Sequence, residues 1–332
     1  MQKQNVLMLN YPIKFQPILK EKIWGGEKIK NILHKNSNAS NIGESWEISD
    51  VDGDRSIVAN GNLKGKSLQE LITNYKAKFV GEKVFKQFGN KFPLLIKFID
   101  AAKPLSIQLH PNDELAKKRH GSFGKTEMWY VIQADNDAGL IVGFKNEVDK
   151  NQYLQHLENK TLTEILNIDL VKEGDVYFIP TGRVHAISAG VMLAEIQQTS
   201  DITYRIYDWD RQDDQGNYRE LHTEYALDAI DFSVQNDYKT SYTKKLNKNI
   251  NIVECQYFTT NIISIDKEFN VDNSDKDSFV IYMCVKGEID IQLKNGMSEN
   301  LKMGETILIP ASLKNLKLIP CEHSEILEIY IK

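Results

Sequence analysis

The stretch Gly174-Asp-Val-Tyr-Phe-Ile-Pro180 recurs in altered form as Gly304-Glu-Thr-Ile-Leu-Ile-Pro310. Both read glycine, an acidic residue, three strand-forming positions, isoleucine and proline. A comparable apolar run precedes each copy, at Met128–Ile132 and at Val280–Cys284. β-branched and aromatic residues favour strands, and the flanking glycine and proline mark turns. The repeat therefore predicts two copies of one β unit.

Most of the chain consists of short apolar runs bounded by Gly, Asn or Asp, a pattern that predicts strands. The expected strands cover residues 56–63, 127–134, 138–144, 175–180, 191–198, 279–285 and 306–310. Helical spacing is limited to residues 66–88, where Ser67 is a plausible N-cap, and to residues 111–119 and 146–166. This pattern predicts a mainly β protein, a sandwich that carries helical insertions.

A length of 332 residues favours two domains. The polar segment 235–251 contains few apolar residues and is the expected linker. We therefore expect an N-terminal β domain with helical insertions over residues 1–234 and a C-terminal β domain over residues 252–332; the residues described below make the first the expected catalytic domain. His185 lies five residues after the first repeat's proline, whereas Asn315 holds that offset in the second, so the second unit is expected to lack metal ligands.

The net charge, the apolar runs and the cysteines of the chain argue against several classes of protein. The net charge of −5 argues against a nucleic-acid-binding protein but leaves room for a local phosphate site. No run approaches the roughly 20 apolar residues of a membrane span, and the first residues do not resemble a signal peptide. The three cysteines form no CxxC pair, which fits a reducing cytoplasm. We expect a cytoplasmic protein without nucleic-acid or membrane partners; the oligomeric state is left open.

A group of polar side chains indicates metal chemistry. In a strand over Ser106-Ile-Gln-Leu-His110, the side chains of Ser106, Gln108 and His110 share one face. Lys125 and Glu127 share a face of the next expected strand, and His185 follows a turn. Two imidazoles and a carboxylate, with a fourth position open or held by an amide oxygen, match a catalytic zinc site.

Each of these residues also has an ordinary structural interpretation. A single His in a β protein is usually a surface or hydrogen-bonded residue, and Glu127 alone would suit the solvent face of a strand. The other five histidines lie in polar contexts and are expected to be solvated. Ligand type also leaves nickel, manganese and iron open.

A second polar segment runs from Glu195 to Arg211. Asp201 and Arg205 frame a stretch that is too polar for a core strand. The planar guanidinium of Arg205 suits a phosphate group or a developing oxyanion. The alternative interpretation of this segment is a solvated loop with salt bridges.

Several separated segments resemble the signature segments of type I phosphomannose isomerases, in the same order. They are WGG (24–26), GESWEIS (43–49), PLSIQLHPND (104–113), GKTEMWYVI (124–132), GRVHAI (182–187) and QQTSDITYRIYDWDR (197–211). The resemblance spans about Pro17 to Arg211, and the tail from about Asn251 is similar to a second cupin unit only loosely. The length is similar to that of the short bacterial branch.

The resemblance implies two cupin (jelly-roll) β-barrel units and interconversion of mannose 6-phosphate and fructose 6-phosphate. It also implies one zinc ion held by His110, Glu127 and His185, with Gln108 or water as the fourth ligand. Arg205 would be the active-site arginine, and the residues lining the substrate pocket would be Lys97, Ser106, Lys125 and Asp201. The general acid/base stays open among zinc-bound water, Lys125, Asp201 and His185.

The same residues are also compatible with two other functions. Two His and a carboxylate also suit a ferrous cupin oxygenase. A sugar-binding bicupin without enzymatic activity is the second alternative.

Overall fold

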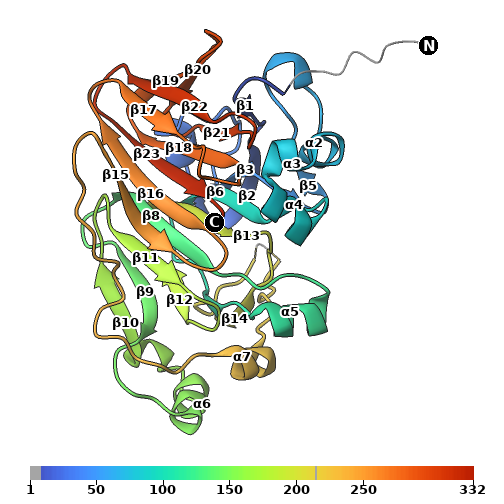
Figure 1. Cartoon of the computed structure of the whole chain (residues 1–332). Helices are drawn as coiled ribbons and strands as arrows, with labels where there is room; N and C mark the ends of the chain where they lie inside the picture. Colours follow the sequence, from blue (N-terminus) through green and yellow to red (C-terminus); the bar gives the residue numbers. More distant parts are fainter. Residues whose placement is uncertain (1–8, 214) are drawn as a thin grey trace.

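Four large antiparallel sheets stacked face to face, together with a two-stranded ribbon, make up the β structure of the described residues (Figure 1). The structure, a computed structural model, describes residues 9–213 and 215–332, so part of the N-terminal segment inspected for a signal peptide lies outside it. No helix in these two ranges is long and apolar enough to cross a membrane. The mainly β, two-barrel prediction is confirmed.

The first barrel is closed by a six-stranded and a five-stranded sheet. The six-stranded sheet has the order β11 (Val176–Ile179), β8 (Glu127–Ala134), β13 (Val191–Gln198), β6 (Leu94–Ala101), β3 (Ile42–Ile48) and β2 (Ile18–Gly26). The five-stranded sheet has the order β10 (Leu166–Leu170), β9 (Gly139–Phe144), β12 (His185–Ile187), β7 (Ile107–Leu109) and β14 (Tyr204–Tyr207). Apolar side chains from both sheets, including Trp129, Leu140 and Leu193, fill part of the space between them.

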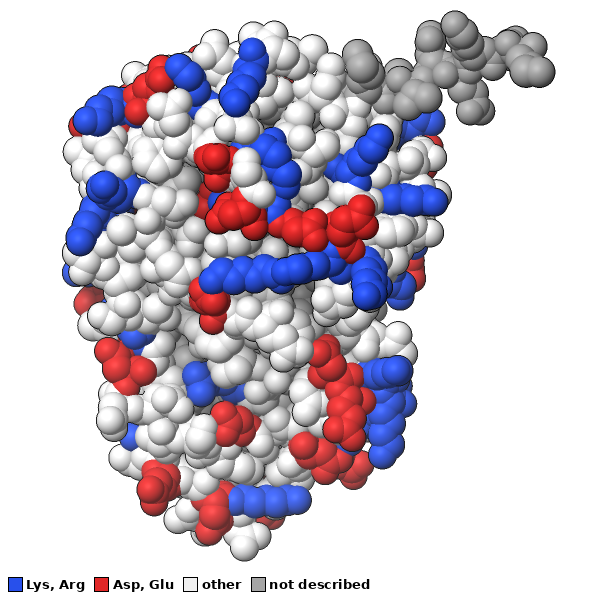
Figure 2. All heavy atoms as spheres, viewed as in Figure 1, with Lys and Arg blue, Asp and Glu red and all other residues white. Residues whose placement is uncertain are grey.

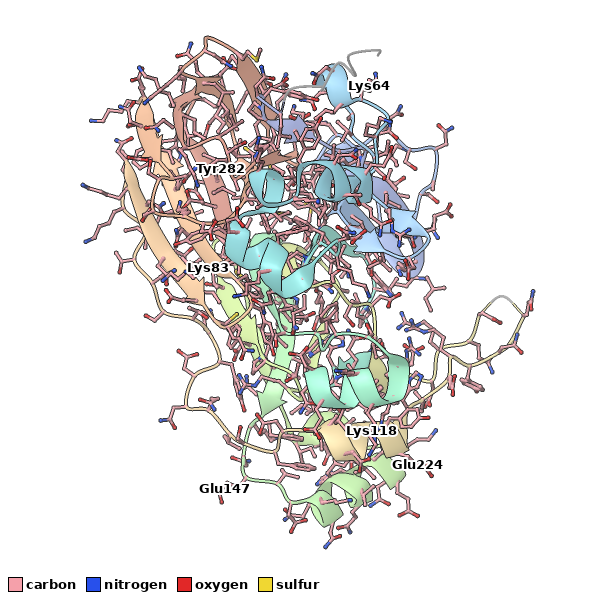
Figure 3. The ribbon with its side chains drawn as sticks, turned by 45° about the vertical axis from the view of Figure 1, so that its right-hand side comes forward. Lys64, Lys83, Lys118, Glu147, Glu224 and Tyr282 are labelled. Atoms are coloured by element: carbon pink, nitrogen blue, oxygen red, sulfur yellow. The ribbon has the colours of Figure 1, made fainter. Side chains whose placement is uncertain are left out.

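The second barrel has the same two-sheet plan. Its larger sheet has the order β1 (Ile13–Lys14), β21 (Thr306–Ile309), β18 (Val280–Lys286), β23 (Ser324–Tyr330), β16 (Thr259–Ile265) and β15 (Lys248–Glu254). Its smaller sheet has the order β17 (Phe269–Asp272), β22 (Asn315–Pro320), β19 (Glu288–Leu293) and β20 (Ser298–Lys302). Tyr282 lies inside this barrel, in the upper part of Figure 3.

The two six-stranded sheets pack against each other through the largest apolar cluster. Met128 and Ile196 of the first barrel and Leu308 and Leu327 of the second belong to it. Alternation along each strand explains this arrangement, because successive residues face opposite sides of the sheet. One set of side chains fills the strand's own barrel, and the other set joins the two barrels.

Helices cover the outer face of the first barrel. They are α1 (Lys28–Asn31), α2 (Leu68–Tyr75), α3 (Ala77–Val80), α4 (Glu82–Phe88), α5 (Asp113–His120), α6 (Lys150–Glu158) and α7 (Thr223–Ala229), with 3-10 turns η1 (Gly61–Leu63) and η2 (Leu162–Glu164) and a short ribbon of β4 (Asp50–Val51) and β5 (Asp54–Arg55). α3 also contacts the second barrel, through backbone bonds from Phe279 to Val80 and from Ala311 to Phe79. Tyr153 of α6 and Ala226 of α7 pack on the outside of the five-stranded sheet. Figure 3 shows Lys118 on α5 and Glu224 on α7 in the lower part of the molecule.

Ser67 caps α2 as predicted. Its hydroxyl accepts a hydrogen bond from the Glu70 amide, and the Glu70 carboxylate accepts one from the Ser67 amide. This capping box starts the helix by satisfying backbone groups that have no partner within it.

Two expectations about elements were wrong. Residues 56–63 do not form a strand, because Ile57 and Val58 make only isolated bridges and the chain then turns into η1. The second concerns the expected linker 235–251, whose last residues belong to β15, which begins at Lys248. β15 is an edge strand with several exposed residues, so its polar composition resembles that of a loop.

The first strand of the chain crosses the expected domain boundary. β1 pairs with β21, with Ile13 opposite Leu308. The proposed division into domains over residues 1–234 and 252–332 therefore needs one amendment. Residues 13–14 contribute to the sheet of the second unit.

Charges of both signs are interspersed over the face shown in Figure 2. This arrangement agrees with the near-neutral composition.

The repeat glycines offer a matched test of packing. Gly174 and Gly304 both have positive φ, +87° and +85°, which strains any residue with a Cβ. A Cβ on Gly174 would meet its nearest atom at 3.5 Å, whereas one on Gly304 would lie 2.7 Å from the Leu33 Cβ. We expect Gly174→Ala to lower the free energy of unfolding by about 1–2 kcal/mol, and Gly304→Ala by roughly 1–3 kcal/mol more. Urea titration measures both values, and equal losses would contradict the tighter packing at Gly304.

Candidate active site

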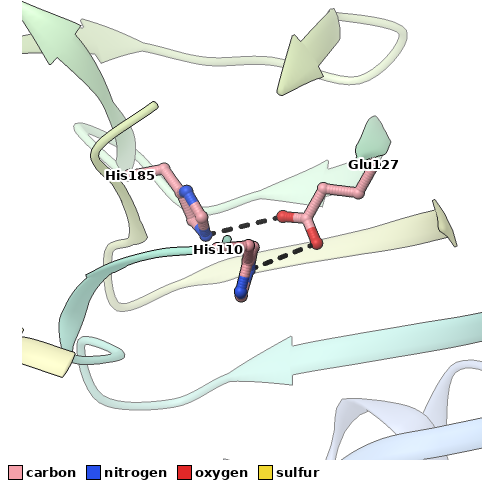
Figure 4. Close-up of side chains that lie close together, drawn as sticks. All are labelled: His110, Glu127 and His185. Atoms are coloured by element: carbon pink, nitrogen blue, oxygen red, sulfur yellow. Dashed lines mark ion pairs between the residues drawn. The ribbon is translucent and has the colours of Figure 1, made fainter. Parts of the chain in front are cut away.

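Three potential metal ligands converge inside the first barrel. His110 directly follows β7, Glu127 begins β8 and His185 begins β12. One ligand atom from each lies within 4.8 Å of the others, and all three side chains are buried. Nε2 of His110 is 3.5 Å from Glu127 Oε2, and Nε2 of His185 is 3.5 Å from Glu127 Oε1 (Figure 4). The structure thus brings together the three donors that the sequence indicated.

Backbone carbonyls orient both imidazoles. Nδ1 of His110 lies 2.8 Å from the Ile202 carbonyl oxygen, and Nδ1 of His185 lies 2.9 Å from that of Arg183. A carbonyl oxygen only accepts, so Nδ1 carries the proton and the Nε2 lone pair faces Glu127. Burial lowers the pKa of His185 to about 3 and holds the pKa of His110 well below its ordinary value. Both rings are therefore neutral, which is the form that binds metal.

Glu127 has an environment that a cation would complete. Burial and the nearby charge of Glu195 raise the pKa of Glu127 to about 7, although Lys125 opposes the shift. Neither carboxylate oxygen receives a well-directed hydrogen bond from the described residues. The Lys125 ammonium forms an ion pair with Oε2 at 2.8 Å and lies 2.9 Å from His110 Nε2. Two neutral imidazoles and an under-satisfied carboxylate fit a divalent ion such as Zn²⁺.

The side-chain amide of Gln108 lies beside the three potential metal ligands, next to His185. On β7 it is the register partner of His185, and its Nε2 lies 3.4 Å from His185 Nε2. Its Oε1 accepts a hydrogen bond from Ser106 Oγ at 3.2 Å. The oxygen and nitrogen of an amide can exchange places by a flip, so the same position also suits an oxygen ligand.

A cavity of about 450 Å³ opens beside the three donors. This volume is in the usual range for small-molecule sites. The predicted pocket residues that line it are Lys97, Ser106, Gln108, Lys125, His185, Asp201 and Arg205. His110 and Glu127 lie behind this surface, against His185 and Lys125. Asp201 stands apart as an exposed residue at the cavity edge.

The alternation predicted for the strand at 106–110 holds. Ser106 and Gln108 face the cavity, whereas Ile107 and Leu109 pack into the apolar cluster on the other side of the sheet. Arg205 on the neighbouring strand β14 is the register partner of Gln108. Its Nε donates to Ser106 Oγ at 3.3 Å, and its Nη1 donates to the Glu220 carbonyl oxygen at 2.8 Å. Burial, strengthened by the positive charge of Arg219, lowers the pKa of Arg205.

Glu195 is a site residue to which the sequence gave no role. In the middle of the sheet it pairs in register with Lys97 on one side and with Trp129 on the other. Its Oε1 lies 3.2 Å from Lys97 Nζ, and its Oε2 accepts a 2.9 Å hydrogen bond from Trp129 Nε1. Burial opposes ionisation of Glu195, but Lys97 and Lys125 lower its pKa to about 2. The sequence feature that could have indicated a role for Glu195 is its acidic side chain inside the otherwise apolar run VMLAEI (191–196).

Trp46 of β3 forms another wall of the cavity. Its ring lies 5.1 Å from Lys97 Nζ, and its Nε1 donates to Glu44 at 2.6 Å. The segment GESWEIS was noted for its resemblance, yet nothing in its spacing predicted that it would reach the cavity. Pairing of β3 with β6 brings Trp46 opposite Lys97.

The second barrel has different residues at two of the metal-donor positions. In the first barrel, the last residue of β11 pairs with Glu127. In the second barrel, the last residue of the equivalent strand β21 pairs with Val280, so Val280 holds the position of Glu127. His185 begins β12, and Asn315 begins the corresponding strand β22. Valine and asparagine thus occupy the two positions that glutamate and histidine hold in the first barrel.

Two family models match the chain. Phosphomannose isomerase type I, catalytic domain, matches residues 13–138, and mannose-6-phosphate isomerase, cupin domain, matches residues 248–319. Mannose-6-phosphate isomerase ManA of Bacillus subtilis is 33% identical over 94% of this chain and 96% of its own length. A mannose-6-phosphate isomerase of Streptococcus mutans is 32% identical over 92% of this chain and 94% of its own.

Solved structures show the same likeness. The crystal structure of the Bacillus subtilis mannose 6-phosphate isomerase superposes with a TM-score of 0.86 at 31% identity, covering 96% of this chain and 99% of the other. A putative mannosephosphate isomerase of Archaeoglobus fulgidus shares the fold, with a TM-score of 0.80 at 23% identity over 98% and 99% of the two chains. The fold, the donor set and full-length similarity agree: this chain belongs to the type I phosphomannose isomerase family.

Proposed function

We propose that this protein interconverts mannose 6-phosphate and fructose 6-phosphate with one zinc ion in the first barrel. The observation that carries the proposal is the convergence of His110, Glu127 and His185 within 4.8 Å beside a cavity rich in cations. Family membership at full length supports the substrate. Oriented neutral imidazoles and the under-satisfied Glu127 support the metal, with Gln108 or water in the fourth position.

Aldose–ketose isomerisation moves a proton between C1 and C2 through an enediol or enediolate. Bound zinc would act as a Lewis acid on the substrate oxygens. The residues of this chain then have three tasks. They hold the open-chain sugar, stabilise the negative oxygen and carry the proton.

Arg205 suits the second task. It is half-buried, lies beside Gln108 and is held by Ser106 and a backbone carbonyl. A guanidinium fixed in advance stabilises developing charge without reorganisation at the moment of reaction. We therefore propose Arg205 as the catalytic arginine.

Lys97, Ser106, Lys125 and Asp201 are proposed to bind substrate. The first three are buried in the cavity wall, and Asp201 lies at its solvent edge. Lys97 is held by Glu195, so its ammonium is fixed for contact with sugar hydroxyls. Proton transfer is assigned to Lys125 Nζ or to the Asp201 carboxylate. Lys125 is nearer to the metal donors, and Asp201 is nearer to water.

Chelation tests this proposal directly. Purified protein is expected to isomerise mannose 6-phosphate in a coupled assay, to lose turnover after EDTA treatment and to regain it with zinc. Metal content measured on the same samples should follow activity, with about one zinc per active chain. Full turnover by metal-free protein would contradict the metal assignment. Oxygen uptake with iron, in place of isomerisation, would contradict the isomerase assignment.

We also propose a cytoplasmic location, consistent with three free thiols.

A further inference from the structure

The cavity has two positively charged sides, and they differ in how their charge is balanced. On one side, Lys20 pairs with Asp54, and Lys22 lies 3.5 Å from Glu44. On the other side, Arg205 and Arg219 line the cavity. Each of these two lysines therefore has a carboxylate partner of its own.

A single buried carboxylate serves the arginine side. Asp208 accepts a 2.7 Å hydrogen bond from Arg219 Nε, a second bond from Arg219 Nη2, and a 2.7 Å bond from Arg211 Nη2. Arg205 forms no ion pair with any carboxylate in residues 9–213 and 215–332. Glu220 contributes a backbone oxygen to Arg205, but its own side chain is 83% exposed. Two guanidinium groups thus bond Asp208, and the third, that of Arg205, has no carboxylate partner among the described residues.

Asp208 also fixes how Arg219 is presented. Its two-point contact uses Nε and Nη2 of Arg219 and leaves Nη1 without a hydrogen bond to the described residues. Burial opposes ionisation of Asp208, yet its bonds to Arg219 and Arg211 lower its pKa, so it stays charged at neutral pH. A guanidinium held rigidly along one edge loses little entropy when its free edge binds an anion.

Arg219 lines a more exposed part of the cavity than the residues beside the metal donors. Gln108 contacts His185, Ser106 bonds Gln108, and Arg205 bonds Ser106. Exposure rises along this line, from a 1% exposed His185 side chain to a 29% exposed Arg219 side chain. The end of a sugar furthest from its reacting carbons would therefore meet Arg219 rather than the buried wall.

We propose that Arg219, positioned by Asp208, binds the phosphate group of the substrate and gives the site its preference for phosphorylated over unphosphorylated sugars. This inference rests on the proposed function. A phosphate monoester carries a charge of about −1.5 to −2 at pH 7, which matches the unbalanced charge on the arginine side. Arg–phosphate contacts are directional and charge-assisted. Lys20 and Lys22 each have a carboxylate of their own, whereas Arg219 shares Asp208 with Arg211.

The test compares zinc-loaded wild type, Arg219→Gln and Arg219→Lys in steady-state kinetics with mannose 6-phosphate. We expect Arg219→Gln to raise KM about 10–100-fold, the range for losing one charge-assisted hydrogen bond, while kcat changes less than about threefold. Arg219→Lys keeps the charge without the fork and should lie between the two. A thermal melt verifies folding, which the partly exposed position of Arg219 should preserve.

Binding of inorganic phosphate provides a readout that is independent of turnover. Calorimetry should show weaker phosphate binding to Arg219→Gln than to wild type, by the same factor as the rise in KM. Lys20→Gln, on the opposite side of the cavity, should change both constants less than about twofold. Phosphate binding that follows Lys20, or an Arg219→Gln effect on kcat alone, would overturn the inference. Wild-type protein that binds phosphate but does not isomerise mannose 6-phosphate would instead refute the proposed function.

Discussion

His110→Ala is expected to yield a folded protein without bound metal, whose kcat/KM is at least about 10³-fold below wild type. Lewis-acid catalysis supplies several kcal/mol of barrier lowering, and each 1.4 kcal/mol is a factor of ten. His110 contributes one of three donors, and the hydrogen bond from its Nδ1 to the Ile202 carbonyl oxygen aims Nε2 at Glu127. Metal content by mass spectrometry and a coupled isomerase assay on one preparation measure the two effects together.

His323→Ala is the matched control for this substitution. His323 is an exposed residue near the second barrel, where its imidazole contacts Ser264. Its loss should leave metal content and kcat/KM unchanged. A His110→Ala protein that kept stoichiometric zinc would show that the ligands lie elsewhere.

Arg205→Ala should separate metal binding from catalysis. Arg205 touches Ser106 and a backbone carbonyl but none of the three metal donors. The variant should therefore retain wild-type zinc content. Its kcat should fall about 10²–10³-fold, the usual effect of losing one group that stabilises an oxyanion.

Arg205→Lys provides the comparison of charge with geometry. Lysine keeps the positive charge but cannot hold Ser106 and the Glu220 carbonyl oxygen with one planar group. We expect it to recover only part of the lost kcat. Wild-type turnover in Arg205→Ala would exclude the arginine from the chemical step, and loss of zinc would give it a structural role instead.

The sequence predicted the barrels because both repeat copies carry local signals for strands. β11 and β21 form at the two repeats, and β8 and β18 form at the apolar runs upstream. The boundaries were harder to predict where pairing decides the outcome. Edge strand β15 is polar because one of its sides faces water, and β1 is only two residues long, too short to show any periodicity.

The metal donors were visible in the sequence because each lies beside a proline or glycine turn, as part of a short motif. Arg219 carried no such signal, since its position depends on a bond to Asp208, eleven residues away in an irregular segment. Glu44 and Trp46 reach the cavity through pairing of β3 with β6, which joins segments about fifty residues apart. Local spacing does not encode such long-range register.

The pairing of Ile13 with Leu308 has a consequence for synthesis of the chain. The two partners emerge from the ribosome 295 residues apart. At about 5–20 residues per second, the first strand waits roughly 15–60 s for its neighbour. During that interval the Ile13 side chain lacks its final cover, and the sheet of the second barrel cannot be completed before the last strands appear.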